Sequence, residues 1–548
     1  MSGGRPHVLP APTADPATVQ ARELIAGLAL RPWGQVAASV YETGRLVADA
    51  PWLVGHEQRV AFLLRTQRPD GGWGPPEGYA LVPTLSATDA LLTALAKPGR
   101  RGAADGLAEP ARRGPDLVTP VARALRVLAG TLLAVDAATL PDTPALDIIV
   151  PALVASINER LAGLERSVVE RLPAAPLPLP RGLGPDRLRA VRAAVAAGVE
   201  LPPKLAHFLE VLGAPPTDPR PTRTAVGASP AATAAWLASA GPDAGPTAHA
   251  FLRELIRDGG GPVPCPTPIT VFERAWVLSG LHRAGIPVTA PPVVLDSLTG
   301  ATAGSGIATG DGLPTDADTT SVTLDALARL GRPAEPASLW AYETADGFCT
   351  WPGEDGFSVT TNAHVLDAFG QHLARRPDAD PRYRRAVERL SVVLAGHQRA
   401  DGGWQDRWHA SPYYATACCV QALVEFGRGP AAAEAVDRAV RWVLATQRPD
   451  GSWGRWAGTA EETAYAVQVL LAAPTGAPGL DDAVARGHAF LHAPGGGEHP
   501  PLWYGKELYC PTAIVRAAVV AACRLAVAHL GGDRSMADCG YRATKTAT

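Results

Sequence analysis

The sequence predicts an all-α protein with two α/α-barrel domains, and three observations lead to this fold class. Apolar residues recur every three or four positions in alanine- and leucine-rich segments such as "TAYAVQVLLAA", whereas the alternating pattern of strands is scarce. The 53 Pro and 56 Gly residues favour many short helices joined by tight turns. A repeated motif in a chain of 548 residues indicates that these helices form stacked pairs in more than one domain.

The repeated motif combines Gln, an Asp-Gly turn and Trp. It reads "QRPDGGWG" from Gln67, "QRADGGWQ" from Gln398 and "QRPDGSWG" from Gln447, with a degenerate copy, "ETADGFCTW", from Glu343. The last three copies start about 50 residues apart, which is the length of a helical hairpin. The turn needs a glycine with positive φ, while Gln and Trp can tie one helix end to its neighbour. We therefore interpret the motif as structural.

Composition and charge limit the function classes. A net charge of -3 with 19% charged residues gives no electrostatic case for a nucleic-acid partner, so an anionic ligand needs a local cluster of positive side chains. The seven cysteines show no CxxC or Cys/His spacing, which suggests neither a disulfide framework nor a zinc site. Without a signal peptide or a long uncharged apolar run, we expect a cytoplasmic protein with no transmembrane segment.

The most distinctive stretch is "GLPTDADTTSVTLDALARL", from Gly312 to Leu330. Asp316 and Asp318 stand one residue apart at the start of an apolar helical pattern, followed by Thr319 and Thr320. Acidic and hydroxyl side chains cap helix N-termini, which is one interpretation. The other is acid catalysis, since paired carboxylates in a buried site can keep a proton on one Asp near neutral pH.

Several segments, in their order along nearly the whole chain, resemble the bacterial class II terpene cyclases, which cyclise a linear prenyl diphosphate by protonation. In the first half the resemblance is carried by "SVYETG" (39–44), "YALVPTLSATDALLTAL" (79–95), "LDIIVPALV" (146–154), "PPKLAHFLE" (202–210), "SPAATAAWL" (229–237) and "GGGPVPCPTPITVFERAWVLSGLHRAGI" (259–286). Downstream it is carried by "SVTTNAHVLDAF" (358–369), "WQDRWHASPYYAT" (404–416) and "LWYGKELYCPTAIVRAAV" (502–519).

The resemblance implies a β domain and a γ domain with an active cavity between them. It implies an N-terminal segment with the first helix of β at 1–45, an inserted γ barrel at 46–290, and the rest of the β barrel at 291–548. In the family's Asp-x-Asp-Asp motif the middle carboxylate is the proton donor, which here corresponds to Asp318, and Thr319 replaces the third Asp. Asn362 is implied as the partner that hydrogen-bonds the acid, with helix capping as the alternative.

Further residues are expected to bind the substrate. Aromatic faces stabilise carbocations without capturing them, and the candidates are Trp351, Phe357, Trp408, Tyr413, Tyr414, Trp503, Tyr504 and Tyr509, with core packing as the alternative for each. Lys204, Arg407 and Lys506 are candidates for the diphosphate, with a solvated surface position as the alternative. The family also implies Mg²⁺, for which Asp142 and Asp147 are the nearest candidate ligands.

The motif variant also carries a resemblance that bears on the chain length of the substrate. Asp-x-Asp-Thr-Thr resembles bacterial drimenyl diphosphate synthases, which implies cyclisation of the C15 farnesyl diphosphate to a bicyclic drimane. Cyclisation of the C20 geranylgeranyl diphosphate to a copalyl- or halimadienyl-type diphosphate is the alternative, and a non-catalytic helical toroid that binds a partner is another. Trp236 could shorten a pocket.

The product is expected to keep its diphosphate, because the only adjacent acidic pair of Asp residues, Asp481-Asp482, lacks the Asp-Asp-x-x-Asp pattern that ionises this group. A separate phosphatase could act next. The residue that removes the final proton is not assigned, because Cys265 stands where plant-type relatives place an Asn. His409 is a conceivable base, with a structural role as the alternative.

Overall fold

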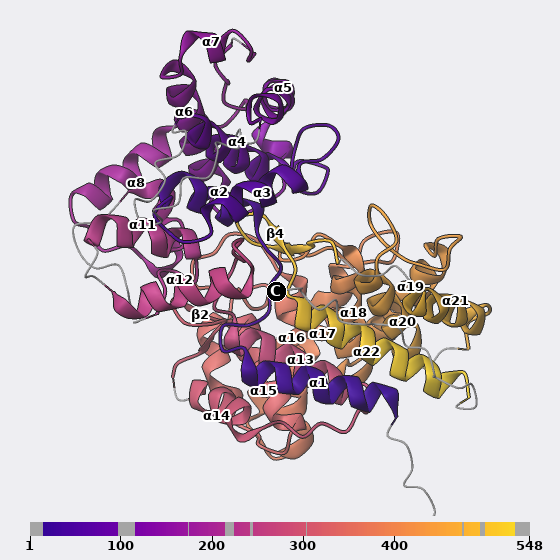
Figure 1. Ribbon diagram of the computed structural model, residues 1–548. Helices are drawn as coiled ribbons and strands as arrows, with labels where there is room; N and C mark the ends of the chain where they lie inside the picture. The colour runs from indigo at the N-terminus through magenta and orange to yellow at the C-terminus, as the bar shows by residue number, and fades with distance from the viewer. Residues whose placement is uncertain are drawn as a thin grey trace, which may run out of the picture.

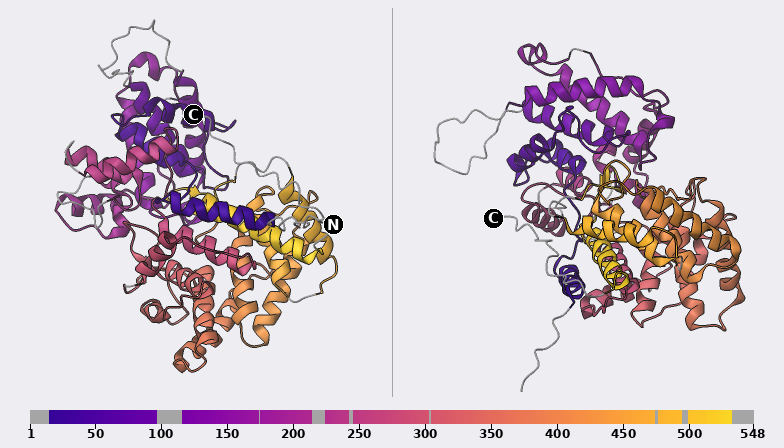
Figure 2. Two further views of the ribbon diagram at one scale, coloured as in Figure 1. Left: turned by 60° about the horizontal axis from the view of Figure 1, so that its bottom comes forward. Right: turned by 90° about the vertical axis from the view of Figure 1, so that its right-hand side faces the viewer.

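A computed structural model describes residues 15–96, 116–173, 175–213, 224–241, 245–302, 304–473, 476–493 and 499–531. The chain folds into two adjacent helical bodies, and one lies above the other in Figure 1 and in both views of Figure 2. The few strands are two short antiparallel pairs, β1 (Ile307–Ala308) with β2 (Thr315–Asp316) and β3 (Trp503–Tyr504) with β4 (Leu508–Tyr509). The predicted all-α class with α/α-barrel domains is confirmed.

The upper body in Figure 1 is the γ domain, drawn from indigo to magenta. Its helices are α2 (Val40–Asp49), α3 (His56–Thr66), α4 (Leu81–Ala96), α5 (Val118–Ala134), η1 (Ala137–Thr139), α6 (Leu146–Ala162), α7 (Arg166–Val169), α8 (Asp186–Ala196), α9 (Pro203–Ala206), α10 (Leu209–Leu212), α11 (Pro230–Ala240) and α12 (Pro246–Asp258). Their buried side chains form two adjoining hydrophobic clusters.

The lower body is the β domain. Its helices are α1 (Pro16–Leu30), α13 (Thr270–Arg283), α14 (Pro292–Ala301), α15 (Ala317–Arg329), η2 (Pro336–Tyr342), α16 (Val359–Arg375), α17 (Pro381–Gly396), α18 (Pro412–Phe426), α19 (Pro430–Ala445), α20 (Ala460–Ala472), α21 (Leu480–His492) and α22 (Thr512–His529). A single hydrophobic core runs from Ala17 to Ala526. The indigo α1 lies along the yellow α22 in Figures 1 and 2, so the first and the last described helices share this domain.

The hydrophobic cores divide the chain at slightly different points from the predicted boundaries at 45/46 and 290/291. Helix α2, which begins at Val40, packs on α4 and α11 in the γ domain. Helix α13 packs on α15 and α22 in the β domain, although it precedes residue 290. The γ insertion therefore lies between α1 and α13. Residues 1–14 of the predicted N-terminal segment lie outside the described residues.

The Gln-Asp-Gly-Trp repeat has the structural role that its residues predict. In the copy at Gln398 the side-chain amide donates to the carbonyl of Gly402 and to that of Ala435 on the neighbouring helix α19, and Trp404 Nε1 donates to the Leu394 carbonyl. The same three bonds recur in the copies at Gln67 and Gln447. Gly402 has φ of 103°, the left-handed region that the turn requires. Each copy thus joins one helix end to its neighbour.

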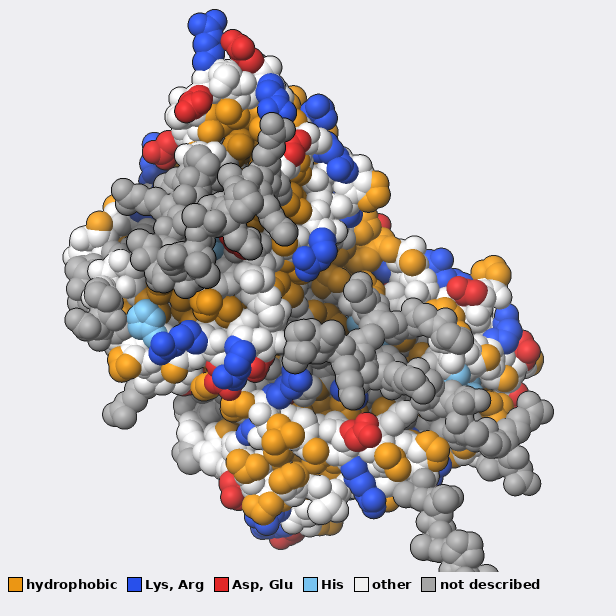
Figure 3. All heavy atoms as spheres, in the orientation of Figure 1, with side chains coloured by type: hydrophobic (Ala, Val, Ile, Leu, Met, Phe, Trp, Pro, Cys, Tyr) orange, Lys and Arg blue, Asp and Glu red, His pale blue; other side chains and the backbone are white. Residues whose placement is uncertain are grey.

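Helix α22 has the length and mean hydropathy, 1.5, of a membrane-crossing helix, which the expectation from sequence had not identified. Its 18-residue span contains Arg516 and Arg524, and 56% of it is buried. It packs against α1, α13, α20 and α21. Packing inside the β core accounts for its apolar composition. On the face shown in Figure 3, Lys and Arg side chains are scattered among acidic and apolar ones.

We expect Glu273 to make the stability of the β domain fall as pH rises. Its carboxyl accepts a bond from the Gln35 N–H at 2.7 Å, and burial raises its pKa to about 7. The folded chain therefore binds more protons than the unfolded chain between about pH 4 and pH 7, so this stabilisation is complete below about pH 4 and is lost as pH rises through 7. Glu273→Gln should remove about 3 kcal/mol of this pH dependence.

Urea unfolding at about pH 5 and about pH 8 measures the effect. The variant should lose less stability than the wild type between the two conditions. Glu434→Gln, at an exposed position of α19, is the matched control and should keep the wild-type pH dependence. Equal pH dependence in Glu273→Gln and the wild type would contradict the assignment.

Candidate active site

A cavity of about 680 Å³ lies between the two domains. The β domain lines it with Asp316, Asp318, Trp351, Glu354, Arg407, Trp408 and Tyr504, among others. The γ domain contributes Asp142, Asp147, Arg187, Lys204, His207 and Phe208. This volume falls in the ordinary range for small-molecule sites, ~300–1,000 Å³. The chemistry-bearing residues predicted from sequence are therefore largely brought together here, from segments far apart in the chain.

Asp316 and Asp318 lie at the start of α15, where both of their sequence interpretations are visible. Asp316 caps the helix, since its carboxylate accepts the Thr319 N–H at 2.6 Å. Burial raises the pKa of Asp316 to about 7, although the Thr319 N–H opposes the shift, and the nearby Asp318 carboxylate adds to it. Asp318, one residue into the helix, faces the cavity. Asp316 is therefore the N-cap of α15, and the Asp318 carboxyl is left available for proton transfer in the cavity.

His364 is the partner of Asp318. Its Nδ1 lies 2.6 Å from Asp318 Oδ1, on the helix α16 that packs beside α15. Burial disfavours the charged imidazolium, but the Asp318 carboxylate outweighs that penalty and raises the pKa of His364 well above its ordinary value. Sequence reasoning missed this residue, which stands two positions after Asn362 in "TTNAHVL".

Asn362 makes different contacts from those that the family resemblance implies. Its amide donates to the carbonyls of Phe348 and Ser358, and its oxygen accepts the Phe348 N–H at 2.9 Å. Residues 362 and 364 are about 200° apart around a helix, so they face opposite sides. Asn362 anchors the loop before α16, and His364 occupies the place beside the acid. Ser358, not Asn362, caps α16.

Thr319 supports the acid region through its side chain. Its Oγ1 lies 3.1 Å from Thr309 Oγ1, and both threonines line the cavity. The third carboxylate of the related motif is thus replaced by a hydroxyl pair that carries no charge. This leaves Asp316 as the neighbouring carboxyl of Asp318 within the motif.

The predicted aromatic residues divide into two groups. Trp351, Trp408, Trp503, Tyr504 and Tyr509 line the cavity, and the rings of Trp351 and Trp408 meet edge to face at 5.2 Å. Tyr414 packs on Trp503 and accepts the Trp276 Nε1–H behind the cavity wall. Tyr413 packs on Trp442, and Phe357 stacks on His397, neither among the residues that line the cavity. Sequence reasoning missed two lining rings, Phe208 and Phe272, although both lie in segments that carry the resemblance.

Two of the three predicted cations lie at the cavity. Lys204 Nζ is 4.0 Å from the centre of the Trp351 ring, and burial lowers its pKa while Glu354 opposes that shift. Arg407 pairs with Glu354 at 3.0 Å and with Asp142 at 2.8 Å. Arg187, which sequence reasoning missed, lines the same cavity and pairs with Asp147. These three side chains are the cations that line the cavity, and both arginines are paired with carboxylates there.

Lys506 makes a structural network instead. Its buried ammonium lies 2.7 Å from both Glu42 and Glu210 and 2.8 Å from Ser229 Oγ, and it is not among the cavity-lining residues. Burial raises the pKa of Glu210 more than Lys506 lowers it. For Glu42 burial also raises the pKa, but the Lys506 charge and the hydrogen bonds from Lys506 and from the Ala231 N–H together outweigh it and lower the pKa. One lysine thus binds two buried glutamates whose pKa values shift in opposite directions, which ties the β3–β4 hairpin to the γ domain.

Asp142 and Asp147 both line the cavity and are the predicted metal ligands. Arg407 engages one oxygen of Asp142, and Arg187 engages one oxygen of Asp147, so each carboxylate keeps a second oxygen. Mg²⁺ that is bound to a diphosphate requires only one or two protein carboxylates. The residues fit such an ion.

His207 is the neutral base of the cavity. Its Nδ1 donates to the Gly227 carbonyl, which leaves the Nε2 lone pair 4.0 Å from Cys265 Sγ. Burial and then the Lys506 charge lower the pKa of His207 to about 3, so the ring is uncharged. The other candidate base, His409, is fully buried beside Glu461 at 3.3 Å and is not a lining residue of the cavity. This position fits the structural role that the sequence analysis named as the alternative for His409.

Comparisons with known proteins bear on this site. A family model described as the squalene-hopene cyclase C-terminal domain matches residues 354–496. An ent-copalyl diphosphate synthase from Streptomyces sp. (strain KO-3988) is 42% identical over 514 residues, which cover 91% of this chain and 94% of that protein. A labda-7,13-dienyl diphosphate synthase from Streptomyces clavuligerus is 42% identical over 531 residues, 94% of each chain.

A solved structure is similar over almost the same length. The ent-copalyl diphosphate synthase from Streptomyces platensis superimposes with a TM-score of 0.86 at 44% sequence identity, covering 93% of this chain and 100% of that one. The two-domain arrangement that encloses the cavity is therefore shared with a solved relative.

Proposed function

The chain belongs to the class II terpene cyclases, enzymes that cyclise prenyl diphosphates, and we propose that it converts geranylgeranyl diphosphate to a bicyclic copalyl-type diphosphate. The observation that carries the proposal is Asp318, which lies in the interdomain cavity with one carboxylate oxygen 2.6 Å from His364 Nδ1. An acid placed in this way can protonate an alkene and begin the cyclisation while the diphosphate stays attached.

The first step is proton transfer from Asp318 to the terminal double bond. Because His364 engages Oδ1, the transferred proton sits on the other oxygen, Oδ2. The Nδ1–H of His364 then stabilises the carboxylate that remains after transfer. Carbon is a weak base, so the carboxyl that protonates it has to carry a proton and be shielded from water, as the interdomain cavity allows.

The carbocation then needs stabilisation without a nucleophile. Trp351, Trp408, Trp503 and Tyr509 line the cavity, and aromatic faces attract cations through their quadrupoles. Lys204 lies over the Trp351 ring and Arg407 over the Trp408 ring, so Trp503 and Tyr509 are the lining rings of this set without such a cation over them in the described contacts. The edge-to-face contact of Trp351 with Trp408 fixes the relative orientation of two of these rings. Fixed rings hold the prenyl chain folded, so that each new cation centre lies near the next double bond.

His207 is the base that we assign to the final proton loss. It is neutral, lines the cavity, and has its Nδ1–H directed to the Gly227 carbonyl, so Nε2 is the accepting atom. A tertiary carbocation is a far stronger acid than an imidazolium, so even a weak base can accept its proton. Burial keeps the Cys265 thiol protonated by raising its pKa, so this side chain does not compete as a thiolate.

The diphosphate is assigned to Lys204, Arg407 and Arg187. Arginine and lysine suit a group with several anionic oxygens, and all three side chains lie at the cavity. Asp142 and Asp147 would hold Mg²⁺ at the same place, and the ion when bound neutralises part of the charge on the diphosphate.

The C20 substrate is favoured over the C15 substrate by two observations. The full-length relatives described above are named for copalyl and labdadienyl diphosphates, which are C20 products. The Asp-Thr-Thr variant, on which the drimenyl interpretation rests, contacts Thr309 beside the acid and does not measure chain length. Trp236 packs in the γ core and is not a lining residue of the cavity. The alternative of a non-catalytic helical toroid that binds a partner is not favoured either, because the chain belongs to a family of enzymes.

Incubation with each prenyl diphosphate tests the proposal. Geranylgeranyl diphosphate should give a bicyclic C20 alcohol after phosphatase treatment, identified by mass spectrometry, with a kcat/KM at least roughly tenfold above that for farnesyl diphosphate. No inorganic pyrophosphate should appear in step with turnover. A drimane formed from farnesyl diphosphate with the higher kcat/KM would replace the C20 assignment by the C15 one. No cyclic product from either substrate would refute the cyclase assignment.

We expect His207→Ala to change the product more than the rate of substrate consumption. Alanine removes the proton acceptor and leaves room for water, so hydroxylated or isomeric diphosphates should replace a large share of the normal alkene. Product ratios by mass spectrometry after dephosphorylation measure this. His529→Ala, at an exposed position of α22, is the control and should give the wild-type product. An unchanged product ratio in His207→Ala would exclude His207 as the base.

A further inference from the structure

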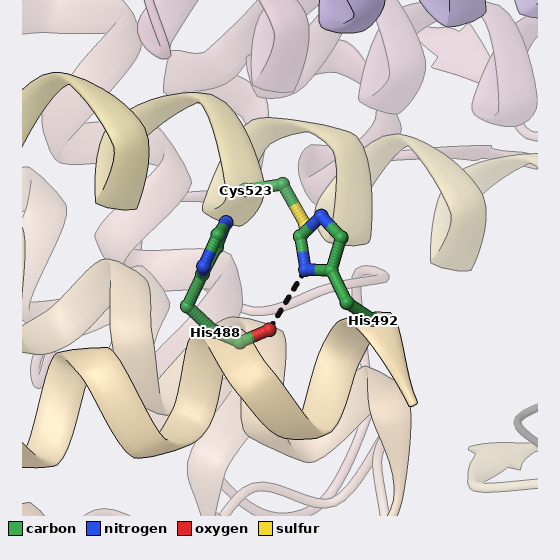
Figure 4. Close-up of side chains that lie close together, drawn as sticks. All are labelled: His488, His492 and Cys523. Atoms are coloured by element: carbon green, nitrogen blue, oxygen red, sulfur yellow. Dashed lines mark hydrogen bonds between the residues drawn. The ribbon is translucent and has the colours of Figure 1, made fainter. Parts of the chain in front are cut away.

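Helices α21 and α22 run antiparallel and carry a cluster of metal-binding side chains between them. His488 and His492 are four residues apart on α21, so they share one face of the helix. That face meets α22, from which Cys523 points toward the two rings (Figure 4). The nearest ligand atoms of the three side chains all lie within 4.8 Å of one another. None of the three lines the cavity, so the cluster is separate from the cyclisation chemistry.

The local hydrogen bonding prepares His492 as a metal ligand. Its Nδ1–H donates to the His488 carbonyl at 2.8 Å, the bond drawn in Figure 4. The lone pair is therefore on Nε2. Metal-binding histidines commonly donate their other ring N–H to a backbone carbonyl in this way, which sets the tautomer and the ring orientation. The spacing of four residues is also the one by which two histidines on a helix bind zinc in known motifs.

The three side chains match Zn²⁺ better than other ions. Two imidazoles and one thiolate are nitrogen and sulfur ligands, which suit Zn²⁺ and do not suit Mg²⁺ or Ca²⁺. Zinc–nitrogen and zinc–sulfur bonds of ~2.0 and ~2.3 Å place tetrahedral ligand atoms roughly 3.3–3.6 Å apart. The cluster needs a contraction of about 1 Å to reach this geometry, which small side-chain rotations supply.

We propose that His488, His492 and Cys523 bind one Zn²⁺ ion, with water as the fourth ligand. The ion joins α21 to α22 inside the β domain. These helices are already linked by the ion pair of Asp481 with His529 at 2.8 Å, and six residues separate Cys523 from His529, about 9 Å along α22. Zinc thus adds a second link between the two helices. Because α22 follows the β3–β4 hairpin that lines the cavity, the link also supports the cavity wall.

The burial of the cluster is compatible with both binding and exchange. Cys523 is 3% exposed and the two histidine rings are half-buried, so the metal would lie under the surface with access from the histidine side. Cys523 is not in a disulfide. Its thiol loses a proton on binding, since thiolate is the form that zinc binds, and the proton passes to solvent.

Titration of the purified full chain with Co²⁺, after removal of metal with EDTA, tests the proposal. The wild type should bind one Co²⁺ per chain and develop a thiolate-to-cobalt charge-transfer band, with ligand-field bands of tetrahedral intensity, and added Zn²⁺ should abolish both. Zn²⁺ should also raise the melting temperature relative to the EDTA-treated chain, because a ligand that binds only the folded state stabilises it.

Variants assign the signal to the cluster. Cys523→Ser should abolish the charge-transfer band and the stabilisation by Zn²⁺, and His492→Gln should weaken binding by at least about tenfold to 100-fold. His492→Gln carries the test if Cys523→Ser does not fold, since its ring is only half-buried. Three results would each overturn the proposal. They are a wild type without the charge-transfer band, a band that Cys523→Ser retains, and Co²⁺ binding by His492→Gln that is as tight as in the wild type.

The chain offers a matched control for each ligand type. Cys419 is a buried cysteine on α18 whose pKa is raised by burial, so Cys419→Ser should keep the cobalt spectrum. His397 makes the same ring-to-carbonyl bond within its helix, to Val393 at 2.9 Å, but belongs to no metal-binding cluster of the described chain. His397→Gln should likewise keep the spectrum. Loss of the band in either control would assign the metal to another place and overturn the proposal.

Discussion

Asp318→Asn is expected to abolish cyclisation. The amide keeps the volume of the carboxyl but has no acidic proton for the alkene, so kcat should fall by at least about 10³-fold, toward the upper end of what a positioned acid contributes. Geranylgeranyl diphosphate incubated with the variant should be recovered unchanged. Product accumulation followed by mass spectrometry after dephosphorylation measures this.

The matched control for this prediction is Asp311→Asn. Asp311 is exposed and precedes the motif by a few residues, so its replacement should leave the rate unchanged. Unchanged circular dichroism of both variants shows that neither change unfolds the chain. If Asp318→Asn retained more than about a tenth of the wild-type rate, another residue would have to be the acid.

Lys506→Met is expected to destabilise the folded chain strongly. The ammonium is 1% exposed and lies 2.7 Å from both Glu42 and Glu210, and methionine has a similar length without the charge. The ionised Glu42 would then be left buried and unpaired, a change that typically costs about 3–5 kcal/mol. Urea or thermal unfolding of the variant against the wild type measures the loss.

A second variant separates the lost charge from the lost packing. In the double variant Glu42→Gln with Lys506→Met, the Glu42 position no longer carries a buried charge that has lost its cation, so part of the stability should return. Equal stability of the double and the single variant would show that shape, and not charge, sets the cost. If Lys506→Met lowered the free energy of unfolding by less than about 1 kcal/mol, Lys506 would behave like a member of a solvent-exposed ion pair, which would contradict its burial.

The predictable part of the fold came from local chemistry. The three full Gln-Asp-Gly-Trp copies fold as the residues predict, because a turn that needs positive φ and a Trp that bonds a carbonyl ten residues earlier are decided within a short stretch of chain. The domain boundaries were less predictable. Helix α13 joins the β core and α2 the γ core through contacts with helices distant in sequence, which periodicity alone does not specify.

The candidate site shows the same division. One motif offered both capping and acid catalysis, and the structure shows Asp316 as the cap while Asp318, the acid that we propose, contacts His364. The choice between Asn362 and His364 as partner of the acid depended on how α16 is rotated against α15, which only their packing determines. The structural role of Lys506, in place of a role in substrate binding, results from contacts with two glutamates more than 290 residues away in sequence.

The sequence by itself thus determined an all-α chain and the structural repeat, and it suggested the acid chemistry that we propose for its Asp-x-Asp motif, because these depend on neighbouring residues and on segments that resemble a family. The tertiary structure alone decided which charges are neutralised inside the protein and which face the cavity, and it brought Cys523 beside His488 and His492, which lie on another helix. The physical reason is that burial and pairing of a charged or metal-binding side chain depend on which helices meet, a property of packing that no local pattern contains.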